Sequence, residues 1–198
     1  KNADKMVSFY KHHTKHLTGM SRSTKDWILD NITQPIHDRK MLSLPEAVEA
    51  IGDKFDVFYT SPKFVQDMRW YKEVLGQNRL FNELALKSYY KTNLNLIDRD
   101  LDLAPHNIEL GKKIEKLCGK AWDISCQCEK DLNEPNVSAF LTITGKIANL
   151  LPKEAHGTKI AIQESSNLLG EANLYKEQQP SFEKWWGRGT QYISLIKK

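Results

Sequence analysis

The sequence has little of what identifies several common protein classes. Its three cysteines, Cys118, Cys126 and Cys128, are an odd number in one helical segment, so free thiols in a reducing cytoplasm are expected. No apolar run approaches the roughly 20 residues of a membrane span, and the first residues lack the apolar core of a signal peptide. Neither sign of charge dominates, since 29 Lys and Arg residues stand against 25 Asp and Glu residues. We therefore expect a soluble, cytoplasmic globular protein with no membrane partner.

Several catalytic and metal-binding signatures are also missing. The G-x-S-x-G elbow, the P-loop and the H-E-x-x-H motif do not occur. His12 and His16 are four residues apart, a spacing at which two imidazoles can share one metal ion, but no third ligand can be assigned. Cys126-Gln127-Cys128 lacks the spacing of a zinc site. A solvated helix face with one packed histidine therefore explains the cluster of His12, His13 and His16, and no metal is expected.

Three helices are predicted in the N-terminal part of the chain. A helix over about residues 4 to 16 ends near Gly19, and a second begins at the capping sequence SRSTKDW and ends at Pro35. The sequence SLPEAVEAIG predicts a third. Ser43 can cap this helix, Glu46 suits the positive end of its dipole, and Gly52 ends it.

Two strands are predicted far apart in the sequence. FDVFYTSP is a short aromatic and β-branched run closed by Ser-Pro, and TQYISLIKK at the C-terminal end has the same character. An isolated strand leaves its backbone groups unpaired. We therefore expect residues 55 to 60 and 191 to 196 to pair antiparallel.

The residues between these strands have helical periodicity. A helix is predicted over about residues 78 to 96, and three further segments follow it. In each segment, apolar or small side chains recur at steps of three and four residues, which places them on one face of a helix. The later sets are Leu110, Ile114, Leu117, Ala121, Ile124 and Cys128; Val137, Leu141, Thr144, Ala148 and Leu151; and Ala161, Ser165, Leu168, Ala172 and Tyr175. The predicted fold is mainly α: an antiparallel helical bundle inserted between two short strands that pair at a sheet edge.

This pattern predicts two domains. Residues 1–62 and 180–198 would form a sheet-edge unit with the N-terminal helices, and residues 63–179 would form the helical insert. Within WWGRG, Gly187 and Gly189 precede a strand, whereas a phosphate-binding loop follows a strand and opens a helix. We interpret these glycines as the turn that returns the chain to the sheet, with Trp185 and Trp186 covering the junction.

The stretch after the first strand is the candidate ligand site. Between residues 67 and 98 it has more aromatic and polar residues than a helix seam requires, and these side chains orient polar ligands in mostly apolar pockets. A core role for the aromatic residues and an ion pair between the arginine and the glutamate are the structural alternatives. The predicted substrate-binding residues are Arg69, Trp70, Tyr71, Asn82 and Glu83.

A second binding hypothesis concerns basic residues. Lys112, Lys113, Lys116 and Lys120 follow one another along a predicted helix. Nucleic acid binding would need such a surface, and its affinity would fall steeply with salt. The same lysines fit a solvated face opposite the apolar seam that begins at Leu110, and we therefore expect no nucleic acid partner.

Several sequences resemble a known family. DWILDNITQPIHDRKMLSLPEAVEAIGDKFDVFYTSP, RWYKE, FNELAL and WWGRGTQYISLIKK resemble the C-terminal portion of bacterial class I S-adenosylmethionine-dependent methyltransferases, over roughly residues 24 to 98 and 182 to 196. The resemblance implies an antiparallel pair of final strands at one edge of an otherwise parallel sheet. It also implies a Gly-rich loop and an acidic residue that hold the cofactor, and this chain contains neither.

The resemblance leads to a functional hypothesis. The chain would be the substrate-side or interface part of a methyltransferase-like protein, and its partner would be an upstream domain that binds S-adenosylmethionine. The chain alone would bind no cofactor and would be inactive. The alternative is a non-enzymatic helical module that binds a protein partner. The sequence assigns no methyl acceptor, whether small molecule or macromolecule, and no general base.

Overall fold

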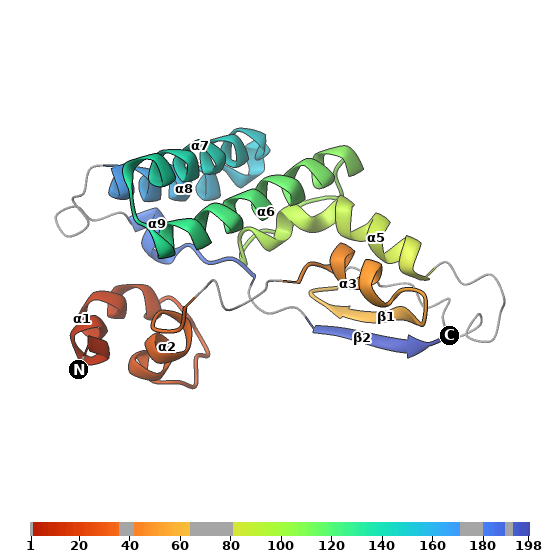
Figure 1. The fold of residues 1–198 in the computed structure, drawn as a ribbon, viewed down its shortest axis with the longest axis horizontal. Helices are drawn as coiled ribbons and strands as arrows, with labels where there is room; N and C mark the ends of the chain where they lie inside the picture. The colour runs from red at the N-terminus through yellow and green to blue at the C-terminus, as the bar shows by residue number, and fades with distance from the viewer. Residues whose placement is uncertain (1, 36–41, 64–80, 171–179, 189–191) are drawn as a thin grey trace. The chain divides into compact units, whose positions relative to one another are not determined.

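A computed structural model describes residues 2–35, 42–63, 81–170, 180–188 and 192–198 (Figure 1). The chain divides into two compact units. Unit 1 comprises residues 1–40 and 119–185, and unit 2 comprises residues 41–118 and 186–198. Within the described ranges, no helix is both long enough and apolar enough to cross a lipid bilayer.

Unit 2 begins with helix α3, Leu44–Ile51, and the predicted capping is confirmed. The Ser43 hydroxyl accepts from the backbone N–H of Glu46, and the Glu46 carboxylate accepts from the backbone N–H of Ser43 at 2.9 Å. Each side chain thus satisfies a backbone donor that the first helical turn leaves open. The helix ends at Gly52, whose N–H donates to the carbonyl of Val48.

A two-stranded sheet follows, and the predicted pairing is confirmed. Strand β1, Phe55–Ser61, pairs antiparallel with β2, Tyr192–Lys197, although residues 62 to 191 lie between them. Val57 lies opposite Leu195 and Tyr59 opposite Ser194, so Phe58 is the extra residue of a β-bulge. The described part of the chain is therefore mainly helical with one small antiparallel sheet, the fold class that the sequence predicts.

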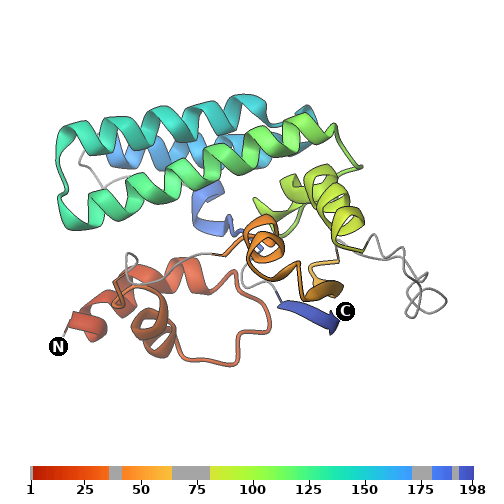
Figure 2. The same ribbon diagram turned by 45° about the vertical axis from the view of Figure 1, so that its right-hand side comes forward.

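Helix α5, Phe81–Thr92, covers the sheet together with α3 (Figure 2). Its buried residues Phe81, Ala85 and Tyr89 recur every four residues, which places them on one face. A short 3-10 helix, η2, Asn93–Leu96, continues from its end. The resulting core has four buried members and five half-buried neighbours, which are Leu44, Val57, Ala85 and Tyr89, with Val48, Leu86, Tyr90, Leu96 and Ile193 packed against them.

Unit 1 contains the N-terminal helix pair, α1, Asn2–Thr14, and α2, Thr24–Asn31. The two helices pack through the rings of Tyr10 and Trp27, whose centroids are 5.9 Å apart. The hydroxyls of Thr14 and Thr24 lie 3.0 Å apart in a hydrogen bond. Gly19, in the connection between the helices, has a φ of 84°, a conformation that glycine adopts without strain.

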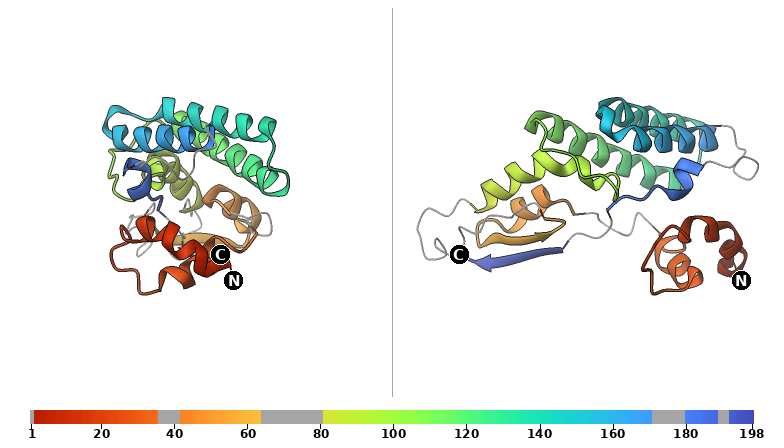
Figure 3. Two further views of the ribbon diagram at one scale, coloured as in Figure 1. Left: turned by 90° about the vertical axis from the view of Figure 1, so that its left-hand side faces the viewer. Right: turned by 180° about the vertical axis from the view of Figure 1, so that it is seen from behind.

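The helical bundle lies mostly in unit 1. Helix α6, Ile108–Lys130, runs from unit 2 into unit 1, where its second half lies alongside α7, Glu134–Leu150, and α8, His156–Gly170 (Figure 3). Helices α7 and α8 contact each other. Ala148 of α7 and Ala161 of α8, which belong to the predicted apolar faces, are both buried. A one-turn helix η3, Lys153–Ala155, joins α7 to α8, and α9, Pro180–Lys184, packs on α8.

The compact units do not follow the predicted boundaries of 1–62 with 180–198 and 63–179. Helix α5 belongs with the sheet because its apolar face packs on β1, although it lies within the predicted insert. Helix α1 belongs with the bundle because the His13 ring packs on the Phe182 ring of α9 at a centroid distance of 5.3 Å. Both contacts join residues distant in sequence, which local patterns do not reveal.

Candidate functional site

Asn82 connects the first turn of α5 to the outer edge of β1. Its Oδ1 accepts from the backbone N–H of Val57 at 2.8 Å, and its Nδ2 donates to the backbone carbonyl of Phe55 at 2.9 Å. These two groups face away from β2, on the side where a further strand would bind. The side-chain amide therefore takes the place of a neighbouring strand's peptide group, and the predicted donor and acceptor of Asn82 are both used.

The structure describes two of the five predicted site residues. Glu83 lies beside Asn82 in α5 and is exposed. Arg69, Trp70 and Tyr71 fall outside the described residues. A pocket formed by all five residues, and the alternative ion pair between Arg69 and Glu83, therefore stay predictions.

The last turns of α5 cross the start of α6. This crossing contains polar contacts that the sequence did not predict. The Tyr89 hydroxyl donates to the Glu115 carboxylate, and the Asn93 amide donates to the Gly111 carbonyl at 2.9 Å. Burial and the nearby Glu115 carboxylate together raise the pKa of Tyr89. The hydroxyl consequently stays protonated and remains a donor.

Gly111 allows the two helices to approach closely. A Cβ atom at this position would lie 1.8 Å from the carbonyl oxygen of Tyr90, so any side chain would force the helices apart. The sequence signal for this contact is weak, because a single glycine inside a helical pattern has several explanations. The close packing of α5 on α6 therefore requires glycine at position 111.

Trp186 and Arg188 bind to η2 and to the loop that follows it. Arg188 donates from its backbone N–H to the Leu96 carbonyl at 2.9 Å and from Nε to the Asn95 carbonyl at 2.7 Å. Its Nη2 donates to the Leu101 carbonyl, and the backbone N–H of Arg99 donates to the Trp186 carbonyl at 2.7 Å. The guanidinium therefore anchors the returning chain directly before β2.

The two tryptophans lie at a boundary, since the division between unit 1 and unit 2 falls between Trp185 and Trp186. Both side chains are half-buried. Gly187 is part of the described structure, and a Cβ there would approach the Leu96 carbonyl oxygen to 3.3 Å. Gly189 lies outside the described residues, so its predicted part in the turn stays a prediction.

The described residues contain no group of three His, Cys, Asp or Glu side chains arranged to hold a metal ion. His12 is exposed, whereas His13 and His16 are half-buried. His13 packs between Tyr10 and Phe182, and its pKa is lowered chiefly by burial. The predicted helix face with a packed histidine therefore corresponds to His13.

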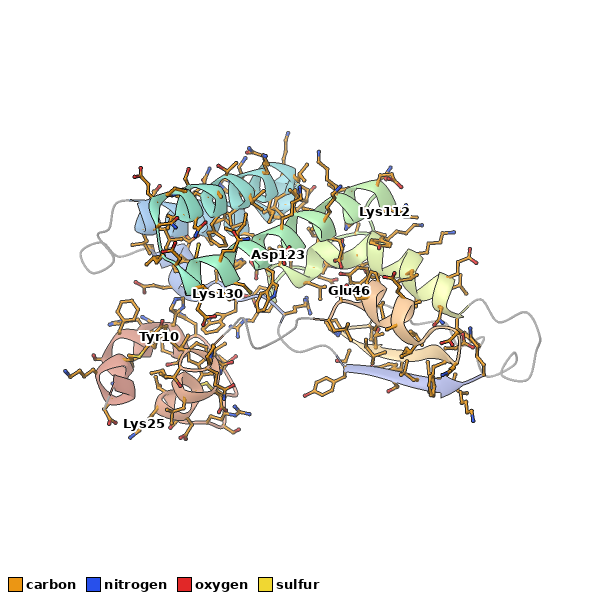
Figure 4. All side chains as sticks on the ribbon, viewed as in Figure 1. Tyr10, Lys25, Glu46, Lys112, Asp123 and Lys130 are labelled. Atoms are coloured by element: carbon orange, nitrogen blue, oxygen red, sulfur yellow. The ribbon has the colours of Figure 1, made fainter. Side chains whose placement is uncertain are left out.

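The lysines of α6 lie on its solvent face. Lys112, Lys113, Lys116 and Lys120 are all exposed, and Lys112 pairs with Glu109 at 3.0 Å (Figure 4). Asp123 and Lys130 continue this face toward the end of the helix. Acidic residues thus interrupt the basic row at both ends, as is typical of a solvated helix face.

No protein-family model, no curated protein and no solved structure matches the chain.

Proposed function

We propose that this chain is the C-terminal, substrate-side or interface part of an S-adenosylmethionine-dependent methyltransferase-like protein. The observation that supports the proposal is the antiparallel pairing of β1 with β2 across residues 62 to 191. The resemblance in sequence requires such a pair of final strands. A purely helical module has no need to bring two distant segments into one small sheet.

The proposal divides the chemistry between two parts. S-adenosylmethionine would bind to an upstream half, where a Gly-rich loop after a strand would bring backbone N–H groups to the cofactor. The present chain would supply the residues that orient the methyl acceptor, with Arg69, Trp70, Tyr71, Asn82 and Glu83 as the candidates. Asn82 would act there through β1, since both ends of its amide already bind the strand. The protein would act in the cytoplasm.

The direct test is the DNA sequence immediately upstream of the Lys1 codon. The proposal expects an open reading frame that encodes a strand, a Gly-rich turn and a helix. A stop codon directly before Lys1 would instead favour a module that acts without a joined cofactor half.

A second test addresses the substrate-binding residues in the longer protein that the proposal expects. Trp70→Ala and Arg69→Ala should reduce methyl transfer while leaving the melting temperature close to that of the parent. A core position predicts a different result for Trp70→Ala, a loss of about 3–5 kcal/mol of stability. Heavy destabilisation of both variants, or full turnover in both, would contradict the site.

The alternative is a non-enzymatic helical module that binds a protein partner through its bundle. Exposed apolar side chains on unit 1 favour this function, because Leu132 is 76% exposed and Leu169 is 41% exposed. These exposed side chains are available to a protein partner. Leu132→Ser and Leu169→Ser should then abolish partner binding without altering methyl transfer by the longer protein, which separates the two functions.

A further inference from the structure

The two strands of the sheet differ in how far other parts of unit 2 cover them. β1 lies between α3 and β2 (Figures 1 and 3), and its residues Val57 and Thr60 are each 2% exposed. In β2, by contrast, all six residues are half-buried or exposed. Ile193 is the residue of β2 that packs against the core of unit 2. Side-chain packing therefore stabilises β1 far more than it stabilises β2.

Contacts on the side away from β2 hold β1 by themselves. Val57 belongs to the buried core together with Leu44 of α3 and Ala85 of α5. Its backbone N–H bonds to Asn82, so Val57 and Leu195 form a pair without hydrogen bonds across the ladder. Separating β2 from β1 would leave these core contacts in place and would break chiefly the backbone bonds of β2.

β2 is anchored on its N-terminal side by Arg188. The backbone N–H of Arg188 donates to the Leu96 carbonyl at 2.9 Å, and its Nε donates to the Asn95 carbonyl at 2.7 Å. Its Nη2 donates to the Leu101 carbonyl. Both guanidinium bonds are part-buried, so water competes little for them, and this end of the strand is firmly held.

A second anchor follows the last residue of β2. The backbone N–H of Lys198 donates to the Lys54 carbonyl at 3.0 Å. Its ammonium group donates to the Gly52 carbonyl and lies 3.7 Å from the carboxylate of Asp56. The Lys198 side chain is 40% exposed, so water readily replaces both ammonium contacts. The end at Lys198 is therefore the weaker of the two anchors.

We propose that β2 is a strap that separates from β1 and rejoins it while the rest of unit 2 stays folded. The ammonium contacts of Lys198 are the latch that releases, and Arg188 is the fixed end. Separation exposes the inner edge of β1, a row of backbone donors and acceptors with which strands pair. The outer edge stays occupied, because Asn82 bonds there in both states.

This opening goes beyond the proposed methyltransferase function and does not depend on it. All the contacts concerned lie within unit 2. The opening is measured as an exchange rate in the 198-residue chain, whereas the proposed function is tested by the upstream reading frame. Failure of either test therefore leaves the other unaffected.

Hydrogen exchange of the unmutated 198-residue chain tests the strap without any variant. Alternation along β2 points the N–H groups of Ser194 and Ile196 toward β1, and they should exchange each time the strap opens. The amides of Ala85 and Leu86 in α5 exchange only when unit 2 unfolds, so we expect their exchange to be slower by about tenfold or more. The Arg188 amide should also exchange more slowly than the two strap amides.

Two outcomes of this measurement would overturn the proposal. If Ser194 and Ile196 exchange as slowly as Ala85 and Leu86, β2 separates only when the whole of unit 2 unfolds. If the Arg188 amide exchanges as fast as the strap amides, the end that we describe as fixed releases together with the strand.

A matched pair of lysine variants tests the latch. Lys198→Met keeps the backbone bond to Lys54 but removes the ammonium contacts, and we expect the amides of Ser194 and Ile196 to exchange about fivefold faster. Lys54→Met removes the same charge from an exposed position and keeps the carbonyl that accepts from Lys198, so it should leave both rates unchanged. Parent-like rates in Lys198→Met would contradict a latch at this residue.

Tyr89→Phe separates opening of the strap from unfolding of unit 2. It removes the hydroxyl that donates to Glu115 at the crossing of α5 and α6, a contact that is present whether the strap is open or closed. Exchange at Ala85 should therefore become about fivefold faster, because the variant unfolds more readily, while exchange at Ser194 and Ile196 should not change. Equal acceleration at all three amides would show that β2 has no opening of its own.

Discussion

At the scale of single residues, Gly111 shows how one missing side chain allows two helices to meet. A Cβ at this position would lie 1.8 Å from the Tyr90 carbonyl oxygen, and backbone cannot move aside as a flexible side chain can. We expect Gly111→Ala to lower the free energy of unfolding by about 3 kcal/mol or more. Chemical denaturation measures this change.

Gly119 provides the matched control on the same helix. No heavy atom lies within 4 Å of the position that its Cβ would take. Gly119→Ala should therefore stabilise the protein by about 0.5–1 kcal/mol, because alanine has the higher helix propensity. Equal effects of the two substitutions would show that α5 and α6 do not approach closely at Gly111.

His13 makes the stability of unit 1 depend on pH. Its pKa is lowered by burial and by the nearby His16, and contacts with Glu183 oppose this shift only in part. The unfolded state therefore takes up a proton at higher pH than the folded state does. Stability is fully present above the unfolded pKa of about 6.5 and is lost as pH falls through the lower folded pKa.

The test compares unfolding free energies at several pH values for two matched variants. His13→Phe keeps a ring against Phe182 but cannot be protonated, so the loss on acidification should be smaller than in the parent. His12→Phe alters an exposed histidine and should leave the dependence on pH unchanged. If the unfolding free energy of His13→Phe depends on pH as that of the parent does, other groups cause the loss of stability on acidification.

At the scale of elements, Asn82 determines how α5 attaches to the sheet. Asn82→Ala removes both hydrogen bonds to β1 and leaves a part-buried N–H and carbonyl without partners, so we expect a loss of about 2 kcal/mol. Asn82→Asp keeps an acceptor for Val57 but sets a carboxylate against the Phe55 carbonyl, and it should also destabilise. Glu83→Ala, at the next and exposed position, should change stability by less than about 0.5 kcal/mol. Equal melting temperatures for all three variants would contradict a stabilising role for the two hydrogen bonds between Asn82 and β1.

The elements themselves were predictable where local chemistry decides them. The capping box of Ser43 and Glu46 lies within four residues, and the strand character of Phe55–Ser61 follows from its aromatic and β-branched residues. The role of Asn82 was not predictable. Its partners are Phe55 and Val57, and the same amide serves equally well as a helix cap, a ligand contact or a bridge to a strand.

At the scale of the whole molecule, the proposed function makes a prediction about the cofactor. The Gly-rich loop and the acidic ribose partner that the resemblance implies are not in the sequence. Calorimetric titration of the 198-residue chain with S-adenosylmethionine should therefore give no saturable heat. Saturable binding in the micromolar range would show that the cofactor site lies within this chain.

The sequence by itself determined the helices and the two strands, because periodicity and capping are properties of short segments. It predicted the antiparallel pairing of these strands because an isolated strand leaves its backbone groups unpaired. The tertiary structure decided which helices belong together. Helix α5 packs on the sheet through Ala85 and Tyr89, and α1 meets α9 through His13 and Phe182. It also decided that Gly111 is a close contact and that Arg188 anchors the returning chain to the Asn95 and Leu101 carbonyls. The physical reason is that an apolar helix face predicts which residues are buried. It does not predict which other segment covers them, because that segment lies elsewhere in the chain.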